Sequence, residues 1–134
     1  MKEINGDLIK LAKKGEFDAI IHGCNCQGNM GAGLAKQIKQ KFPKANLIDT
    51  GEERPAEIYS VQYPNGLSVI NAYTQIYYGK ANNKYSAFSP INNYQEKVKD
   101  TQNNRYRFIR YAFSLVNKYF KGKKIGIPKI GCGL

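Results

Sequence analysis

The stretch GCNCQGNMGAGLAKQIKQKFP, residues 23–43, begins where a hydrophobic strand ends and finishes as an amphipathic helix. Residues 17–24 form a continuous apolar run of strand length, which is typical of a strand covered on both faces. Leu34, Ile38 and Phe42 then recur at helical spacing, and a proline follows them. The stretch therefore predicts a central strand, a tight glycine-rich turn and a helix.

Turn and cap signals divide the rest of the N-terminal half of the chain. Residues 1–5 have the composition of a short strand, and Gly6-Asp7 then marks the start of a helix that ends near Gly15. Two β-rich runs flank Pro64-Asn65-Gly66, so we expect a hairpin over residues 57–75. A hairpin makes the predicted sheet mixed rather than purely parallel.

The C-terminal half is less regular. Residues 76–104 show little periodicity, which predicts a long loop that a ligand could order as a lid. A helix with Gly122 as its stop is expected next, then a strand, KIGIP, and a second glycine loop, KIGCGL. The apolar face predicted for that helix consists of Tyr106, Ile109, Phe113, Val116 and Phe120.

The order of these elements favours an α/β fold with three layers, in which helices cover both faces of a central mixed sheet. A chain of 134 residues is of single-domain size, and we expect one domain over residues 1–134. It contains no apolar run of about 20 residues and no signal-peptide core, so we expect no membrane association and a cytoplasmic location, or the host cytoplasm if the source is viral.

Charge and cysteine content leave several partners open. The formal net charge of +11 attracts phosphates, whether of a nucleic acid or of a small anionic ligand, but a solvated lysine surface explains it equally well. The chain has three cysteines, and reduced thiols are the default. A zinc site built from His22, Cys24, Cys26 and Cys132 is conceivable, but the usual CxxC pairs are missing, so no metal is expected.

Two nucleotide-binding motifs can be set aside. The spacing GNMGAG is GxxGxG rather than the GxGxxG of dinucleotide folds, and no strand with an acidic end follows about 20 residues later. A Walker loop also fails because GK[ST] is absent. The two glycine loops can still bring backbone N–H groups close to an anion, since ligands of open α/β sheets bind beyond the carboxyl ends of the strands.

Three motifs in order resemble the macrodomain family of ADP-ribose-binding modules: Gly6-Asp7-Leu8, the block IIHGCNCQGNMGAGLAKQIKQKFP, and IPKIGCGL near the C-terminus. The branch is similar to the ADP-ribose 1''-phosphate phosphatases and the terminal ADP-ribose glycohydrolases. The resemblance is weakest over residues 76–104. Family members usually continue with another helix and strand, so it implies either a natural short form or a fragment.

The resemblance also implies a ligand site. Asp7 matches the acidic residue that accepts a hydrogen bond from adenine, although it is equally suited to cap a helix, and Leu8 would offer its backbone N–H. Asn25 matches the residue that binds the distal ribose, with a turn role as the alternative. Two loops would cradle the diphosphate and the distal end: Gly31, Ala32 and Gly33, and Gly131, Cys132, Gly133 and Leu134.

The catalytic assignment is less complete. His22 matches a histidine of the phosphatase-like branch and could orient water, and Asn25 would position the ribose; a buried structural histidine is the alternative. Gln75, assigned to ligand binding, lies where the glycohydrolase branch has its lysine nucleophile, and it cannot form that adduct. Lys80 lies further along the predicted loop.

We therefore expect a macrodomain that binds ADP-ribose or an ADP-ribosylated derivative and hydrolyses a terminal group, with phosphate as the leading choice, without a cofactor. Two alternatives remain within the family: an ADP-ribosyl hydrolase acting on protein or nucleic acid, and a reader that binds without turnover. A third is a basic nucleic-acid module that stacks bases on Tyr77, Tyr78 and Tyr85.

Overall fold

The computed structural model describes residues 7–128, and its centre is a four-stranded sheet with the order β2-β3-β1-β6. The strands are β1 (Ala19–Asn25), β2 (Ile58–Gln62), β3 (Ser68–Gln75) and β6 (Ile125–Gly126). β1 runs parallel to both of its neighbours, and β2 is antiparallel to β3. The predicted mixed sheet, its hairpin and its central strand are all confirmed.

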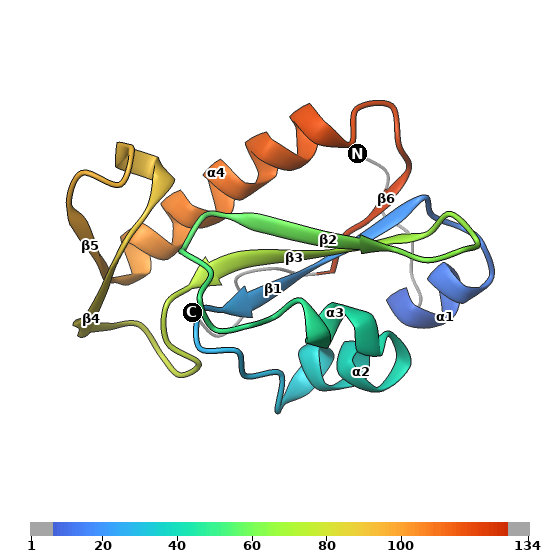
Figure 1. The fold of residues 1–134 in the computed structure, drawn as a ribbon, viewed down its shortest axis with the longest axis horizontal. Helices are drawn as coiled ribbons and strands as arrows, with labels where there is room; N and C mark the ends of the chain where they lie inside the picture. Colours follow the sequence, from blue (N-terminus) through green and yellow to red (C-terminus); the bar gives the residue numbers. More distant parts are fainter. Residues whose placement is uncertain (1–6, 129–134) are drawn as a thin grey trace.

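Helices cover both faces of this sheet (Figure 1). α1 (Leu8–Lys13), α2 (Gly33–Lys41) and α3 (Pro43–Leu47) lie on one face, and α4 (Gln102–Tyr119) crosses the other. The three-layer α/β arrangement predicted from the order of elements is thus confirmed. Pro43, expected only to end a helix, also opens α3, because its fixed φ and missing N–H suit the first turn of a helix.

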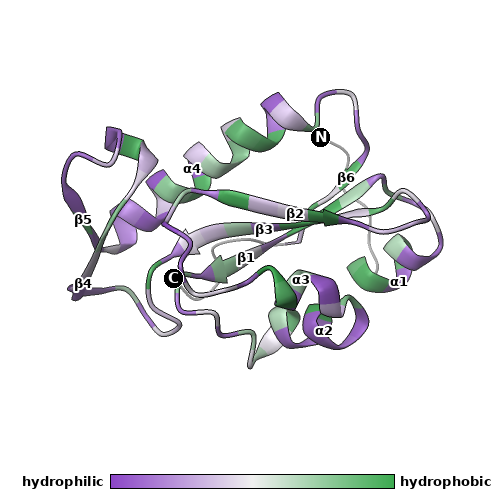
Figure 2. Ribbon diagram, viewed as in Figure 1, coloured by the Kyte–Doolittle hydropathy of each residue, from purple (hydrophilic) through white to green (hydrophobic). Residues whose placement is uncertain are grey.

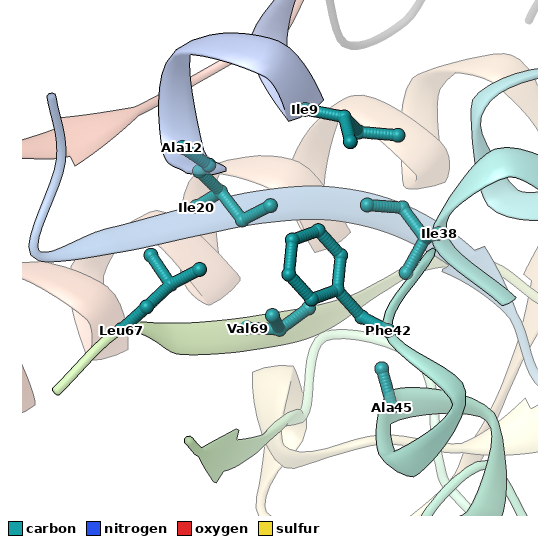
Figure 3. Packing of buried hydrophobic residues seen from close by; sticks show 8 residues of the cluster. All are labelled: Ile9, Ala12, Ile20, Ile38, Phe42, Ala45, Leu67 and Val69. Carbon is teal, nitrogen blue, oxygen red and sulfur yellow. The ribbon is translucent and has the colours of Figure 1, made fainter. Parts of the chain in front are cut away.

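The first core lies between the sheet and the three short helices. Ile38 and Phe42 project from α2 and its C-terminal end toward side chains of β1 and β3 (Figure 3). All members of the cluster are at most 6% exposed. They are Ile9, Ala12, Ile20, Ile38, Phe42, Ala45, Leu67 and Val69.

The second core lies under α4, and the predicted face of this helix is partly wrong. Phe113 and Phe120 pack against the cluster and Val116 is buried, as expected, but Tyr106 is 48% exposed. The residues of α4 that are buried are Arg105, Phe108, Ala112 and Val116. The face is displaced by about one residue at its N-terminal end because a charged side chain, Arg105, occupies a core position there.

The predicted loop at residues 76–104 is also wrong. It contains an antiparallel pair, β4 (Asn82–Phe88) and β5 (Lys97–Asp100), joined through a 3-10 turn, η1 (Pro90–Asn92). Figure 2 shows that this pair is mostly hydrophilic, unlike β1. It lies beside one end of α4, where a small cluster of Ala56, Ile76, Ala87 and Phe108 supplies its apolar support.

Two sequence expectations concern the ends of the chain. The strand predicted at residues 1–5 lies outside the described residues, and of the run KIGIP only Ile125–Gly126 pairs as β6. Within residues 7–128, no helix combines the length and the apolar character needed to cross a bilayer.

Candidate functional site

A pocket of about 420 Å³ opens where β1 and β3 end and α2 begins. In α/β sheets this edge, beyond the carboxyl ends of parallel strands, is where ligands bind. Four of the residues that the sequence assigned to ligand binding, Asn25, Gln75, Gly31 and Ala32, come together in its wall. The complete lining is Gly23, Cys24, Asn25, Asn29, Gly31, Ala32, Ala35, Gln75 and Tyr78.

Asn25 organises the turn that forms one side of the pocket. Its Oδ1 accepts hydrogen bonds from the backbone N–H groups of Gln27 (2.9 Å) and Asn29 (3.4 Å), and its Nδ2 donates to the Asn29 carbonyl (2.9 Å). Asn25 is only 8% exposed. The turn role that the sequence left open is therefore observed, and the same side chain also borders the pocket.

Glycines allow this turn to pack closely and to enter α2. Gly28 has φ +69°, and a Cβ there would lie 3.2 Å from the backbone N of Gly51, so a side chain would be strained and crowded. Gly33, the first residue of α2, has φ +58°. The N-cap, Ala32, gives the helix no side-chain hydrogen bond, which leaves the first-turn N–H groups available to an anion.

The opposite wall comes from the turn after β3. Gln75 Nε2 donates to the carbonyl of Tyr77 (2.8 Å), so this side chain stiffens the turn rather than reaching freely into the pocket. The ring of Tyr77 stacks on that of Tyr85, with centroids 4.1 Å apart and planes 10° apart. Tyr78 borders the pocket and is 57% exposed. Of the three tyrosines considered as stacking platforms, Tyr77 and Tyr85 thus stack on each other.

A buried ion pair holds that turn in place. Arg105, on α4, donates from Nε and Nη2 to the two carboxylate oxygens of Asp100, at 2.8 and 2.9 Å. The same Nη2 donates to the carbonyl of Gly79 (2.8 Å), and Asp100 accepts from the backbone N–H of Tyr77 (2.9 Å). Sequence periodicity gave no signal for this anchor, because charged residues on a helix are normally exposed.

His22 does not lie in the pocket wall. Its ring is 1% exposed, and Nε2 lies 2.6 Å from Oδ1 of Asn71. Asn71 Nδ2 donates to the Ala45 carbonyl (2.9 Å), so its oxygen faces the histidine and Nε2 carries the proton. Burial lowers the pKa of His22 to about 4, opposed by the Asn71 hydrogen bond. The ring is a neutral core group, the alternative that the sequence also allowed.

Two thiols lie near the strand end. Cys24 is buried and borders the pocket, and Cys26 is partly buried; neither is in a disulfide. Burial, with a smaller contribution from nearby carboxylates, raises the pKa of both thiols, so they stay protonated and unreactive at neutral pH. Residues 7–128 contain no group of three or more side chains able to hold a metal, and Cys132 lies outside that range.

Asp7 caps α1, Leu8 begins that helix, and the predicted ligand residues of the second glycine loop lie outside the described residues. Asp7 Oδ1 accepts from the backbone N–H groups of Ile9 (2.9 Å) and Lys10 (3.2 Å). Leu8 is the first residue of that helix. The second glycine loop, Gly131, Cys132, Gly133 and Leu134, falls outside the described residues.

The cap gives a direct test of the structural role of Asp7. Asp7→Ala should lower the free energy of unfolding by about 1 kcal/mol because two N–H groups of α1 lose their acceptor. Asp7→Ser, which restores a capping oxygen, should stay close to wild type. Urea denaturation followed by circular dichroism measures both, and equal losses in the two variants would show that the cap is not the cause.

Five pocket residues were not assigned to the ligand site from the sequence: Gly23, Cys24, Asn29, Ala35 and Tyr78. Gly23 and Asn29 belong to the glycine-rich stretch, so their approximate position could be predicted from the sequence. A Cβ on Gly23 would lie 2.9 Å from Oγ1 of Thr74, which explains a glycine there. Tyr78 was considered only for base stacking, because its segment was expected to be an irregular loop.

Comparison with known proteins identifies the class of fold. Solved macrodomain structures superpose on nearly the whole chain. The macrodomain of Mycobacterium tuberculosis DarG is 18% identical, with a TM-score of 0.65 over 96% of this chain and 75% of that one. Thermosipho africanus DarTG, solved in complex with ADP-ribose, is 16% identical, with a TM-score of 0.67 over 96% of this chain and 32% of that one. The fold is that of a macrodomain.

Two sequence relatives are similar to this chain, one over its full length and one over a short segment. An uncharacterized 17.5 kDa protein of Enterobacteria phage T4 is 28% identical over the full chain and 79% of its own length. An ADP-ribose 1''-phosphate phosphatase of Aspergillus oryzae is 53% identical over 48 residues, which are 36% of this chain and only 22% of the phosphatase. No family model matches the sequence. The chain therefore has a macrodomain fold, as its motifs predicted, and one segment of it is similar to the ADP-ribose 1''-phosphate phosphatases.

Proposed function

We propose that the chain binds ADP-ribose in the 420 Å³ pocket and hydrolyses a terminal phosphate from the distal ribose. The observation that carries the binding proposal is the position of the pocket, at the ends of β1 and β3 and against the N-terminus of α2. Two comparisons support it: the segment shared with ADP-ribose 1''-phosphate phosphatases, and the ADP-ribose complex of the structural neighbour DarTG.

Each wall of the pocket has a distinct part in this proposal. The backbone N–H groups of Ala32 and Gly33 would receive the diphosphate, because uncapped N–H groups and the helix dipole favour negative charge. The N–H of Gly31 donates to Oδ1 of Asn29 (2.9 Å) and holds the turn beside them. Asn25 would hold the turn and border the distal ribose. Tyr78, on the facing wall, would cover the ribose with an apolar ring. Asp7 and Leu8 are proposed for adenine.

The phosphatase step must then rely on the ligand itself for acid-base chemistry. The described part of the pocket lining contains no carboxylate, imidazole or ammonium group. We propose that water attacks the terminal phosphorus while a diphosphate oxygen of the ligand accepts its proton. The bond from phosphorus to the ribose oxygen breaks, the proton passes from the diphosphate oxygen to that ribose oxygen, and ADP-ribose and inorganic phosphate leave. Positioning of the reactants supplies the catalysis, with no direct role for His22.

The same lining favours a second candidate, a reader that binds ADP-ribose without turnover. A site without a titrating group near neutrality can hold a nucleotide by backbone and amide contacts alone. The two candidates share the pocket and differ only in whether phosphate is released. The hydrolysis of ADP-ribose from protein or nucleic acid by a lysine adduct is less favoured, because Gln75 and not a lysine borders the pocket.

Calorimetric titration with ADP-ribose, with AMP and ADP as competitors, tests the binding proposal. Ala35→Phe would place a ring in the pocket from α2 and should weaken ADP-ribose binding at least about tenfold. Gln37→Phe adds the same ring on the exposed side of α2 and should leave affinity within about twofold. Equal affinities in the two variants would place the ligand elsewhere.

Phosphate release separates the enzyme from the reader. Wild-type protein that binds ADP-ribose should release inorganic phosphate from ADP-ribose 1''-phosphate, and Ala35→Phe should lose this activity in step with its affinity. Tight binding with no release above the uncatalysed rate would establish the reader instead.

A further inference from the structure

A second groove, of about 660 Å³, runs between the edge strand β2 and the helix α4, away from the proposed nucleotide pocket. Aromatic rings dominate its walls, and three of them, Tyr59, Tyr94 and Tyr119, are 45%, 45% and 65% exposed. Exposed rings gathered along one groove are typical of an interaction site. The lining is Glu57, Ile58, Tyr59, Ser60, Pro90, Asn93, Tyr94, Tyr111, Leu115, Tyr119 and Phe120.

The groove follows the edge of the sheet. β2 ends the strand order β2-β3-β1-β6, so one side of its backbone has no partner strand among the described residues. Consecutive side chains of a strand point to opposite faces, yet Ile58, Tyr59 and Ser60 all line the groove. It therefore follows the strand edge itself, where N–H and C=O groups are open to pairing with another chain.

The charge of the groove is opposite to that of the protein. The whole chain has a net charge of +11, yet no lysine or arginine lines the groove, and its one charged lining residue is Glu57. Glu57 raises the pKa of both Tyr59 and Tyr94, in addition to the effect of burial, so its charge acts at both rings. A carboxylate beside several tyrosine rings is suited to a cation.

The turn after η1 is built to bring Tyr94 to Glu57. Asn93 and Tyr94 both have left-handed backbone, with φ +59° and +60°, which is uncommon for two successive residues that are not glycine. The Tyr94 hydroxyl then donates to Oε2 of Glu57 at 2.6 Å. Oε1 accepts from the backbone N–H of Arg54 at 2.6 Å. The carboxylate is thus fixed, and each oxygen retains a lone pair for a ligand.

We propose that this groove binds an extended basic segment of a partner protein. The segment would pair with the free edge of β2, and one arginine or lysine side chain would insert between Tyr59, Tyr94 and Tyr111 to reach Glu57. Lys118 already lies 5.3 Å from the centroid of the Tyr119 ring, so the incoming cation would use the rings beside Glu57 instead. This function is separate from the nucleotide pocket.

A labelled peptide tests the proposal with the intact chain. The probe is Thr-Val-Arg-Val-Thr, acetylated and amidated, titrated by fluorescence anisotropy and by amide NMR shifts. Replacing its arginine with citrulline keeps the shape and removes the charge, and should weaken binding about tenfold. N-methylation of the backbone on the pairing side should weaken it similarly. The largest shifts should fall on residues 57–60 and Tyr94.

Variants of the protein supply the matched controls. Glu57→Gln keeps an acceptor for Arg54 N–H but removes the charge, and Tyr59→Ala removes a ring; each should weaken the arginine peptide about tenfold and leave ADP-ribose titration unchanged. Tyr106→Ala removes an exposed ring of α4 outside the groove and should change nothing. Equal binding of the arginine and citrulline peptides, no binding of either, or displacement by a short oligothymidylate would each overturn the proposal.

Discussion

Arg105→Ala should lower the free energy of unfolding by about 3–5 kcal/mol, the largest effect we expect from a single side chain of this protein. Arg105 is 1% exposed and Asp100 is fully buried, so removing the guanidinium leaves a buried carboxylate without its counter-charge. The carbonyl of Gly79 also loses its donor. Guanidinium denaturation followed by circular dichroism measures the loss.

Two further variants distinguish the loss of the ion pair from a general effect of shortening a side chain on α4. Arg107→Ala removes an exposed arginine of the same helix, bonded only to Asn104 among the contacts that residues 7–128 show for it, and should cost less than about 1 kcal/mol. Arg105→Lys keeps the charge but loses the bidentate geometry. Its loss in free energy of unfolding should lie between those of Arg105→Ala and Arg107→Ala. A loss below about 1 kcal/mol for Arg105→Ala would mean that Asp100 is solvated or protonated once its partner is gone.

Arg105→Ala should also affect the proposed nucleotide pocket. Arg105 and Asp100 together bind the backbone from Ile76 to Gly79, and Tyr78 of that turn borders the pocket. Loosening the turn at a temperature where the protein is still folded should weaken ADP-ribose binding more than Arg107→Ala does. We therefore expect stability and ADP-ribose affinity to fall together when this buried pair is broken.

Local patterns explain why half of the fold could be predicted from the sequence. The strand at residues 19–25, the turn and α2 form one short contiguous unit, and the hairpin depends on a turn at Pro64-Asn65-Gly66; Gly66 has φ +94° in the structure. In both cases the determining residues are close together in sequence. Hydrophobic periodicity and turn residues predict elements of this kind directly.

The β4-β5 pair could not be predicted because its support is distant in sequence. Its strands are polar, and their packing depends on Phe108 of α4 and on Ile76, while Asp100 at the end of β5 is held by Arg105. No local pattern marks a polar strand stabilised in this way. The same buried arginine displaced the apolar face of α4 from its predicted position.

In the candidate site, too, local sequence patterns located some residues and left the position of another open. The sequence could place the glycine turn, Asn25 and Gln75 near one another because strand ends and helix starts locate them, and the structure brings Asn25, Gly31, Ala32 and Gln75 together in one pocket. For His22 the sequence left both a catalytic and a buried structural role open, because burial cannot be read from a single residue type; the structure places the ring in the core. It faces Asn71, in the neighbouring strand and at the paired register position.

Acidification should destabilise the protein through His22, before most carboxylates titrate. The histidine has a pKa of about 4 in the folded chain and about 6.5 when unfolded. Between these values the unfolded chain binds more protons, so the stabilisation is complete above about pH 6.5 and is lost as the pH falls toward 4. The loss should reach about 2 kcal/mol at pH 5 and about 3 kcal/mol below pH 4.

The physical reason is that an imidazolium has no favourable position in this core. Asn71 offers one amide oxygen to Nε2, while the thiol of Cys24 lies 3.7 Å from Nδ1, where a protonated ring would need a second acceptor. Asn71 is itself fixed by the Ala45 carbonyl and lies 3.5 Å from the Tyr73 hydroxyl, so the amide cannot turn without breaking its own bonds.

His22 is the only histidine, which makes the measurement unambiguous. NMR titration of its ring protons should show no midpoint above pH 5, and the difference in free energy of unfolding between pH 7 and pH 5 should exceed that of His22→Gln by about 2 kcal/mol. A midpoint near 6.5 would mean that the ring reaches water. In that event His22 would again be a candidate for orienting water, and the proposed phosphatase step would no longer depend on the ligand's diphosphate alone.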